Sequence, residues 1–100
     1  DKLSVIENQK EILLRRFEED SIFYFHGQQI TVTPTLIATV KSYADLNRQK
    51  IILLDDFKTP FKVADPENFL MKLSTKYQEA LGTYESEYTK LIQQRGNLDA

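Results

Sequence analysis

The chain has 100 residues, of which 41% are hydrophobic and 28% are charged, and its formal net charge is -2. These values are typical of one small folded domain with a single core. The absence of cysteine excludes disulfides, thiolate catalysis and zinc–thiolate sites, and it fits a cytoplasmic protein. The net negative charge argues against a nucleic-acid binder, and no apolar run reaches the ~20 residues that span a membrane.

The first 20 residues favour a helix. From Leu3 to about Glu19, apolar side chains recur on one face, as they do in an amphipathic helix. We expect this helix to stop at the acidic residues 18–20, because negative charge is unfavourable at the negative end of the helix dipole. The apolar face consists of Leu3, Ile6, Leu13 and Phe17.

Residues 21–47 favour a β-hairpin followed by a helix. Aromatic and β-branched residues over 22–25 and an alternating pattern over 30–32 predict two strands, with a turn at residues 26–29. Thr33 or Thr35 can cap the following helix, Pro34 suits its first turn, and apolar side chains repeat until Asn47.

Residues 51–63 favour a second hairpin. The segment 51–54 is apolar at every position, which predicts a central strand that is buried on both faces. Residues 55–59 are expected to form the turn. The returning strand over 60–63 begins with Pro60, which suits an edge strand or the first position of a strand.

The C-terminal third favours a single long helix. Asp65 can cap it, Pro66 suits its first turn, and Arg95 and Gly96 are expected to end it. Such a helix would be about 45 Å long, whereas a compact domain of this size is only about 33 Å across. We therefore expect the helix to overhang its domain and its apolar stripe to need a partner. The stripe consists of Leu70, Leu73, Tyr77, Ala80, Leu81, Tyr84, Tyr88 and Leu91.

Together these segments predict a single α+β domain. A helix over 1–20 is followed by a hairpin and helix over 21–47 and by a hairpin and long helix over 51–96. We expect the four strands to form one small antiparallel sheet covered by helices. Duplication of a hairpin–helix unit and chance likeness both account for the similarity of the last two units. The long helix is expected to cover the sheet through Phe69, Leu70, Leu73, Tyr77 and Leu81.

The outer half of the long helix is the candidate interface. Its side chains are expected to contact either the first helix of the same chain, packed antiparallel, or another subunit. The candidate interface residues are Tyr84, Tyr88, Leu91 and Ile92.

Few residues offer catalytic chemistry. Asp55 and Asp56 are a carboxylate pair at a strand end, where Mg²⁺ sites are often built, and His26 is a candidate general base. Neighbouring strand residues point to opposite faces, so the two carboxylates converge only if the turn rotates one of them. Roles in turns are the simpler interpretation of all three residues. We predict no catalytic, cofactor-binding or metal-binding residue.

The tyrosines of the long helix are compatible with base stacking in a nucleic-acid groove, but such grooves also need a positive track. Acidic residues at positions 79, 85 and 87 surround these tyrosines. Half-buried packing or a protein interface is therefore the favoured interpretation.

Several short motifs lie between Ile51 and Arg95. They are Ile52-Leu53-Leu54-Asp55-Asp56, Thr59-Pro60, Lys76-Tyr77, Glu79-Ala80, Tyr84-Glu85, Tyr88 and Leu91. With these motifs, this part of the chain resembles small uncharacterised proteins of T4-like marine bacteriophages. The resemblance covers less than half of the chain. It implies a phage accessory or assembly protein in the host cytoplasm or the virion, and it transfers no functional residue.

The sequence therefore favours a non-enzymatic, self-associating assembly or adaptor module. Its expected partner is a second copy or another protein, and no cofactor, nucleic acid or membrane is expected. The alternative is a small metal-dependent phosphoryl-transfer or hydrolytic enzyme that uses Asp55 and Asp56.

Overall fold

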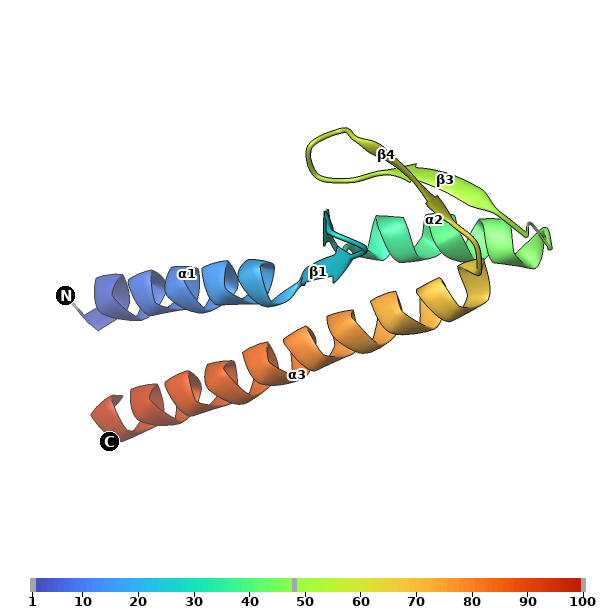
Figure 1. Cartoon of the computed structure of the whole chain (residues 1–100). Helices are drawn as coiled ribbons and strands as arrows, with labels where there is room; N and C mark the ends of the chain where they lie inside the picture. The colour runs from blue at the N-terminus through green and yellow to red at the C-terminus, as the bar shows by residue number, and fades with distance from the viewer. Residues whose placement is uncertain (1, 48, 100) are drawn as a thin grey trace.

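The chain is an α+β protein with the expected element order. The computed structural model describes residues 2–47 and 49–99, and within them it contains three helices and four strands (Figure 1). In chain order these are α1 Lys2–Asp20, β1 Ile22–Phe25, β2 Gln28–Thr31, α2 Pro34–Asp45, β3 Ile51–Leu54, β4 Pro60–Val63 and α3 Pro66–Asp99.

The molecule is elongated, with extents of 57 × 25 × 18 Å and a radius of gyration of 17.5 Å. A compact chain of this length would have a radius of gyration of about 13 Å. Figure 1 shows the reason: α1 and the second half of α3 run side by side as an arm, and the first turn of α1 and the last turns of α3 lie at its tip. We call residues 2–20 and 77–99 the arm, and residues 21–76 the head.

The long helix α3 overhangs the head as predicted, and it is longer than predicted. Asp65 caps its start, since its Oδ1 accepts a hydrogen bond from the Asn68 N–H at 3.1 Å. At 34 residues, α3 spans most of the long dimension of the molecule. The predicted end at Gly96 is wrong, because the helix continues to Asp99. The side chain of Arg95, the expected terminal cation, lies outside the described residues.

The first hairpin is tighter than predicted. His26 and Gly27 alone form the turn, with φ values of 50° and 81°. Two successive positive φ values give a type I′ turn, whose twist matches that of the flanking strands. Gln28 and Gln29 therefore belong to β2 and not to the turn. The helix α2 then starts at the expected cap, where Thr33 Oγ1 accepts a hydrogen bond from the backbone N–H three residues later, at 3.1 Å.

The predicted single four-stranded sheet is wrong, because the strands form two separate antiparallel pairs. In the first, Ile22 lies opposite Thr31; in the second, Ile51 lies opposite Val63. Aromatic packing joins the two pairs in place of a shared ladder. Phe25 of β1 lies 4.9 Å from Phe69 of α3 and 6.0 Å from Phe61 of β4, measured between ring centroids.

The prediction of β3 as a central strand buried on both faces is also wrong. Ile51 is buried, but Ile52 and Leu54 on the opposite face are 64% and 57% exposed. With β4 as its only ladder partner among the described residues, β3 is an edge strand. An all-aliphatic strand therefore presents half of its side chains to solvent.

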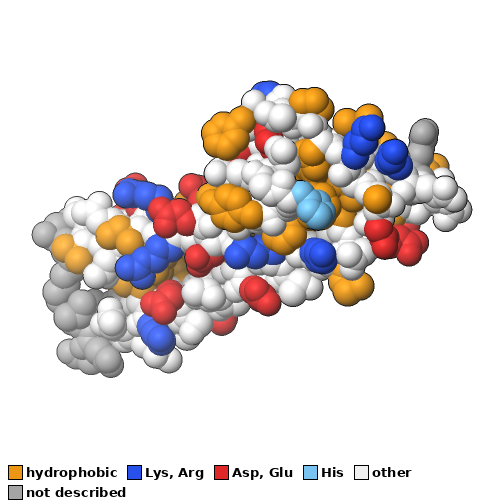
Figure 2. Space-filling model, in the orientation of Figure 1, with side chains coloured by type: hydrophobic (Ala, Val, Ile, Leu, Met, Phe, Trp, Pro, Cys, Tyr) orange, Lys and Arg blue, Asp and Glu red, His pale blue; other side chains and the backbone are white. Residues whose placement is uncertain are grey.

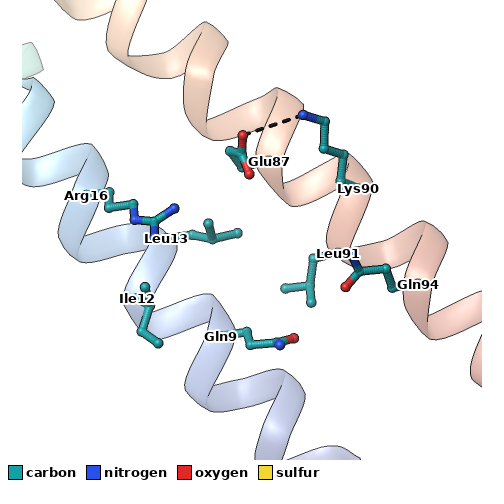
Figure 3. A pocket seen from close by; sticks show the side chains of 8 residues that line it. All are labelled: Gln9, Ile12, Leu13, Arg16, Glu87, Lys90, Leu91 and Gln94. Carbon is teal, nitrogen blue, oxygen red and sulfur yellow. Dashed lines mark ion pairs between the residues drawn. The ribbon is translucent and has the colours of Figure 1, made fainter.

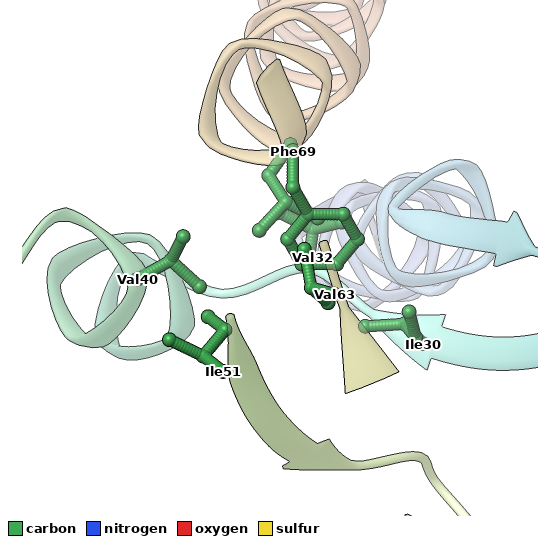
Figure 4. Packing of buried hydrophobic residues seen from close by; sticks show 7 residues of the cluster. Ile30, Val32, Val40, Ile51, Val63 and Phe69 are labelled. Carbon is green, nitrogen blue, oxygen red and sulfur yellow. The ribbon is translucent and has the colours of Figure 1, made fainter. Parts of the chain in front are cut away.

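The core of the head lies where α2, α3 and the two hairpins meet, and Figure 4 shows side chains from each converging there. α3 contributes the largest group in this core, Phe69, which is 1% exposed, together with Leu73, which is fully buried. Leu70 and Tyr77 pack against the cluster as expected. Its buried residues are Ile30, Val32, Val40, Ile51, Val63, Phe69 and Leu73.

The arm is held by an apolar seam between α1 and α3. Phe17 of α1 packs its ring against Tyr77 and Tyr84 of α3, with centroid distances of 5.6 and 5.5 Å. Nearer the tip, Ile6 and Leu91 are 6% and 7% exposed. The first helix therefore covers the overhanging half of α3 within one chain.

We expect Leu73→Ala to lower the free energy of unfolding by about 2–5 kcal/mol, because it removes fully buried methyl groups and leaves a cavity in the head core. Met71→Ala on the same helix is the control, since Met71 is 65% exposed and its loss should cost far less. Urea denaturation followed by circular dichroism measures both. Equal effects of the two substitutions would contradict this core.

Candidate functional site

Asp55 organises the turn between β3 and β4. Its Oδ1 accepts hydrogen bonds from the N–H groups of Phe57 at 2.8 Å and Thr59 at 2.9 Å. Its own N–H donates to the Thr59 carbonyl at 3.0 Å, and the residue is 6% exposed. Aspartate side chains commonly stabilise turns in this way, by accepting hydrogen bonds from backbone N–H groups a few residues later in the chain. Asp55 therefore acts within its own loop.

Asp56 joins the two hairpins. Its N–H donates to the Gln29 carbonyl of β2 at 2.9 Å, and its Oδ1 accepts from the Thr31 N–H at 2.9 Å. Its Oδ2 accepts from the Thr31 hydroxyl at 2.7 Å and from the Gln29 amide at 3.1 Å. Asp56 thus forms hydrogen bonds with the outward backbone groups of β2, to which a neighbouring strand would otherwise bind.

These contacts shift the titration of Asp56. Burial alone would raise the pKa of its carboxyl. Hydrogen bonds from the hydroxyl and N–H of Thr31 and from the Gln29 amide favour the charged form, as does the positive charge of Lys58. The net effect holds the pKa of Asp56 below its usual value of 3.8. The ionised carboxylate is therefore a stabilising part of the fold.

The residues of the enzymatic alternative do not converge. The carboxylates of Asp55 and Asp56 serve different hydrogen-bond sets, one inside the loop and one across to β2. His26 is exposed in the first hairpin turn, with its ring 4.2 Å from that of Phe25. Within residues 2–47 and 49–99, no three His, Asp or Glu side chains gather closely enough to hold a metal ion. The arrangement supports loop geometry and offers no shared catalytic centre.

The candidate interface residues lie along the arm, and most of them face α1. Leu91 is buried, Tyr84 packs on Phe17, and only Ile92 is classed as exposed, at 38%. Of the two predicted contacts, the structure shows the one with the first helix. A contact between subunits at these residues stays a prediction.

One side of the arm carries exposed apolar side chains beyond its seam, next to an ion pair between Lys10 and Glu7 at 3.6 Å. The Lys10 Nζ lies 5.8 Å from the centre of the Tyr88 ring, so these two residues mark the same side of the helix pair. Leu14 follows Lys10 by four residues and Ile92 follows Tyr88 by four, a spacing that keeps each on that side. Leu14 is 46% exposed. We call Leu14, Tyr88 and Ile92 the apolar side of the arm.

The other side of the arm carries a shallow groove of about 310 Å³ with a mixed polar and apolar lining. Figure 3 shows its two walls, one from α1 and one from α3, with Lys90 and Glu87 paired at 3.7 Å on the α3 wall. Leu13 and Leu91 form its floor at the seam. The residues around it are Gln9, Ile12, Leu13, Arg16, Glu87, Lys90, Leu91 and Gln94.

A second exposed surface lies on the outer face of the β3–β4 hairpin, and sequence reasoning missed it. Besides Ile52 and Leu54, the turn residue Phe57 is 72% exposed. Figure 2 shows apolar and basic side chains next to one another over this hairpin. The only sequence signal is the strand 51–54, which is apolar at every position and whose pattern predicts burial. We call Ile52, Leu54 and Phe57 the hairpin patch.

Comparison of the chain with protein-family models, curated proteins and solved structures finds no match. No helix in the described part of the chain is both long enough and apolar enough to cross a membrane.

We expect Asp56→Asn to lower the free energy of unfolding by about 1 kcal/mol at neutral pH, because it removes charge-assisted hydrogen bonds to Thr31. The pKa of Asp56 is lower in the folded protein than in the unfolded chain. The contribution is therefore complete above pH 3.8 and is lost as the pH falls through the folded value. Urea denaturation of the wild type and the variant over this pH range measures the difference.

Glu19→Gln is the control for this prediction, since the Glu19 side chain is exposed and makes no hydrogen bond or ion pair among the described residues. A stability difference between wild type and Asp56→Asn that stays constant through the acid range would show that the charge of Asp56 does not link the hairpins.

We expect millimolar Mg²⁺ or Mn²⁺ to leave the Tm unchanged, because Asp55 and Asp56 bind separate hydrogen-bond donors. A metal that occupies a site in the folded state must raise the Tm, since it binds the native state alone. Differential scanning fluorimetry with and without metal measures this. A rise in Tm that Asp55→Asn abolishes would restore the enzymatic alternative.

Proposed function

We propose that this protein is a non-enzymatic assembly or adaptor module that self-associates through the apolar side of its arm. The observation that carries the proposal is the geometry of the arm. A layer of only two helices has no third element to cover the side chains that flank its seam. Leu14 and Ile92 are left exposed there, beside the half-buried Tyr88 ring.

A second copy fits this side because an isologous contact needs only one self-complementary surface. Two arms that pack through the same side form a four-helix bundle, which gives each helix a further apolar neighbour. The aromatic ring of Tyr88, with its hydroxyl at the rim, is typical of protein interfaces. The opposite side is a groove of mixed polar and apolar lining, with the charged residues Arg16, Glu87 and Lys90 around it.

The resemblance of residues 51–95 to small proteins of T4-like marine bacteriophages is compatible with this proposal. It implies an accessory or assembly role, and assembly proteins act through surfaces of this kind and not through catalytic groups. The host cytoplasm or the virion would be the setting for such a role.

We expect the wild type to have about twice its monomer mass of 11.7 kDa in solution and Leu14→Glu/Ile92→Glu to be monomeric. Both positions are exposed in the chain, and Glu is a good helix former, so the arm should stay folded. Light scattering behind size exclusion measures the mass, and circular dichroism checks the helix content.

Ile12→Glu is the matched control, because Ile12 is 45% exposed on the grooved side of the arm. It should leave the mass unchanged. A wild type that is monomeric at every concentration, or a double variant that keeps its mass, would refute self-association through this side. Asp substitutions at Tyr84 and Leu91 are unsuitable, since they would break the seam within the chain.

A further inference from the structure

The outer edge of β3 offers unpaired backbone groups at Ile52 and Leu54, and it ends at Asp56, whose N–H donates to Gln29 of β2. Asp55 N–H donates to the Thr59 carbonyl, so this pair is hydrogen-bonded. Because bonded and non-bonded pairs alternate along an antiparallel ladder, Ile52 and Leu54 point their N–H and C=O groups away from β4. Pro60 lies opposite Leu54 in a pair that is not hydrogen-bonded, so its lack of an N–H costs no bond in the ladder. Among the described residues, no backbone hydrogen bond reaches these outward groups.

The side chains beside this edge are aliphatic and exposed. Ile52 and Leu54 are 64% and 57% exposed, and they lie on the outer face of the hairpin. A further strand along β3 would pair these backbone groups and place its own side chains beside Ile52 and Leu54 on the same face. An exposed strand edge flanked by aliphatic side chains is the surface on which an extended chain adds by β-augmentation.

The lysines around the edge of β3 indicate which kind of added strand would bind there. Lys50 precedes β3, Lys58 lies in the turn after it, and Lys62 lies opposite Ile52. None of these lysines forms an ion pair among the described residues. Of the two acids in the turn, Asp55 is buried, and Asp56 bonds to β2 and offsets part of the charge of Lys58. The edge is therefore locally basic in a chain whose net charge is -2.

We propose that β3 binds an extended segment of a partner protein as an added strand, and that this segment is aliphatic in its middle and acidic at its ends. Aliphatic side chains would pack beside Ile52 and Leu54, and acidic ends would meet Lys50 and Lys58. A second copy fits less well because it brings the same lysines. A lipid headgroup would neutralise the lysines but leave the strand N–H groups unpaired.

This inference rests on the proposed function, in which the arm pairs two copies and leaves both heads free to bind partners. It assigns the adaptor role to the head and gives the partner a chemical description. Because the strand has only four residues, the contact is small and its affinity should be modest.

The test is a titration of a fluorescent synthetic peptide with the full chain. The peptide alternates valine and threonine in its middle and carries glutamates at both ends. We expect a Kd of about 0.1 mM, at least about tenfold weaker binding to Ile52→Thr/Leu54→Thr, and no binding of a peptide with lysine ends. Thr keeps the strand propensity, and Met71→Gln, equally exposed at 65%, is the control that should bind normally.

Hydrogen exchange gives a second readout, because an added strand should slow exchange at the Ile52 and Leu54 amides and leave α2 unchanged. Failure to saturate at millimolar peptide, or equal binding of the lysine-ended peptide, overturns the proposal. Anionic phosphatidylserine vesicles that bind through Ile52 and Leu54 would assign the edge to lipid and also overturn it.

The oligomeric mass separates this inference from the proposed function. A dimer that Ile52→Thr/Leu54→Thr disrupts would mean that a second copy occupies the edge, which overturns the choice of partner. A dimer that only Leu14→Glu/Ile92→Glu disrupts, together with no peptide binding, keeps self-association and refutes the added strand. Peptide binding by a monomeric wild type keeps the added strand and refutes self-association.

Discussion

Two-stranded sheets of four-residue strands are not stable on their own, so both hairpins of this protein depend on apolar surface supplied by α3. The first half of α3 provides Phe69 and Leu73 to the head core, and its second half provides Leu91 to the seam of the arm. One uninterrupted helix thus belongs to two apolar clusters. Ser21, whose hydroxyl bonds the Phe17 carbonyl at 2.8 Å, fixes the point where the chain passes from one cluster to the other.

Much of this arrangement could be predicted from the sequence. Element order, the caps at Thr33 and Asp65 and the overhang of the last helix follow from local signals that act within a few residues. The pairing of the hairpins does not, because it depends on contacts between distant residues. Asp56 pairs the outer backbone groups of β2, and the packing of Phe25, Phe69 and Phe61 joins the two hairpins. The hairpins therefore need no strand-to-strand ladder between them. An all-aliphatic strand therefore ends at an edge, where pattern alone predicts the centre of a sheet.

The candidate site was predictable only in part. Asp55 and Asp56 were identified as the notable carboxylates, and turn residues were the favoured interpretation. Their different roles do not follow from the sequence, because two adjacent aspartates look alike. Asp55 binds N–H groups of its own loop, whereas Asp56 binds Thr31 of a strand 25 residues away. Exposed apolar surface is harder still to foresee. Ile52 and Ile51 look alike in sequence, and only the fold decides which of them reaches water.

α1 begins and α3 ends at the same end of the molecule (Figure 1), and this determines how the arm responds to tension. A pull on both ends acts across the seam and peels the helices apart one turn at a time. The contacts at Ile6 and Leu91 are the first to be strained, and the Phe17 aromatic packing follows. Shear across a whole interface would instead stretch all contacts at once. A pull on the two helix ends therefore loads the seam of the arm before it reaches the core of the head.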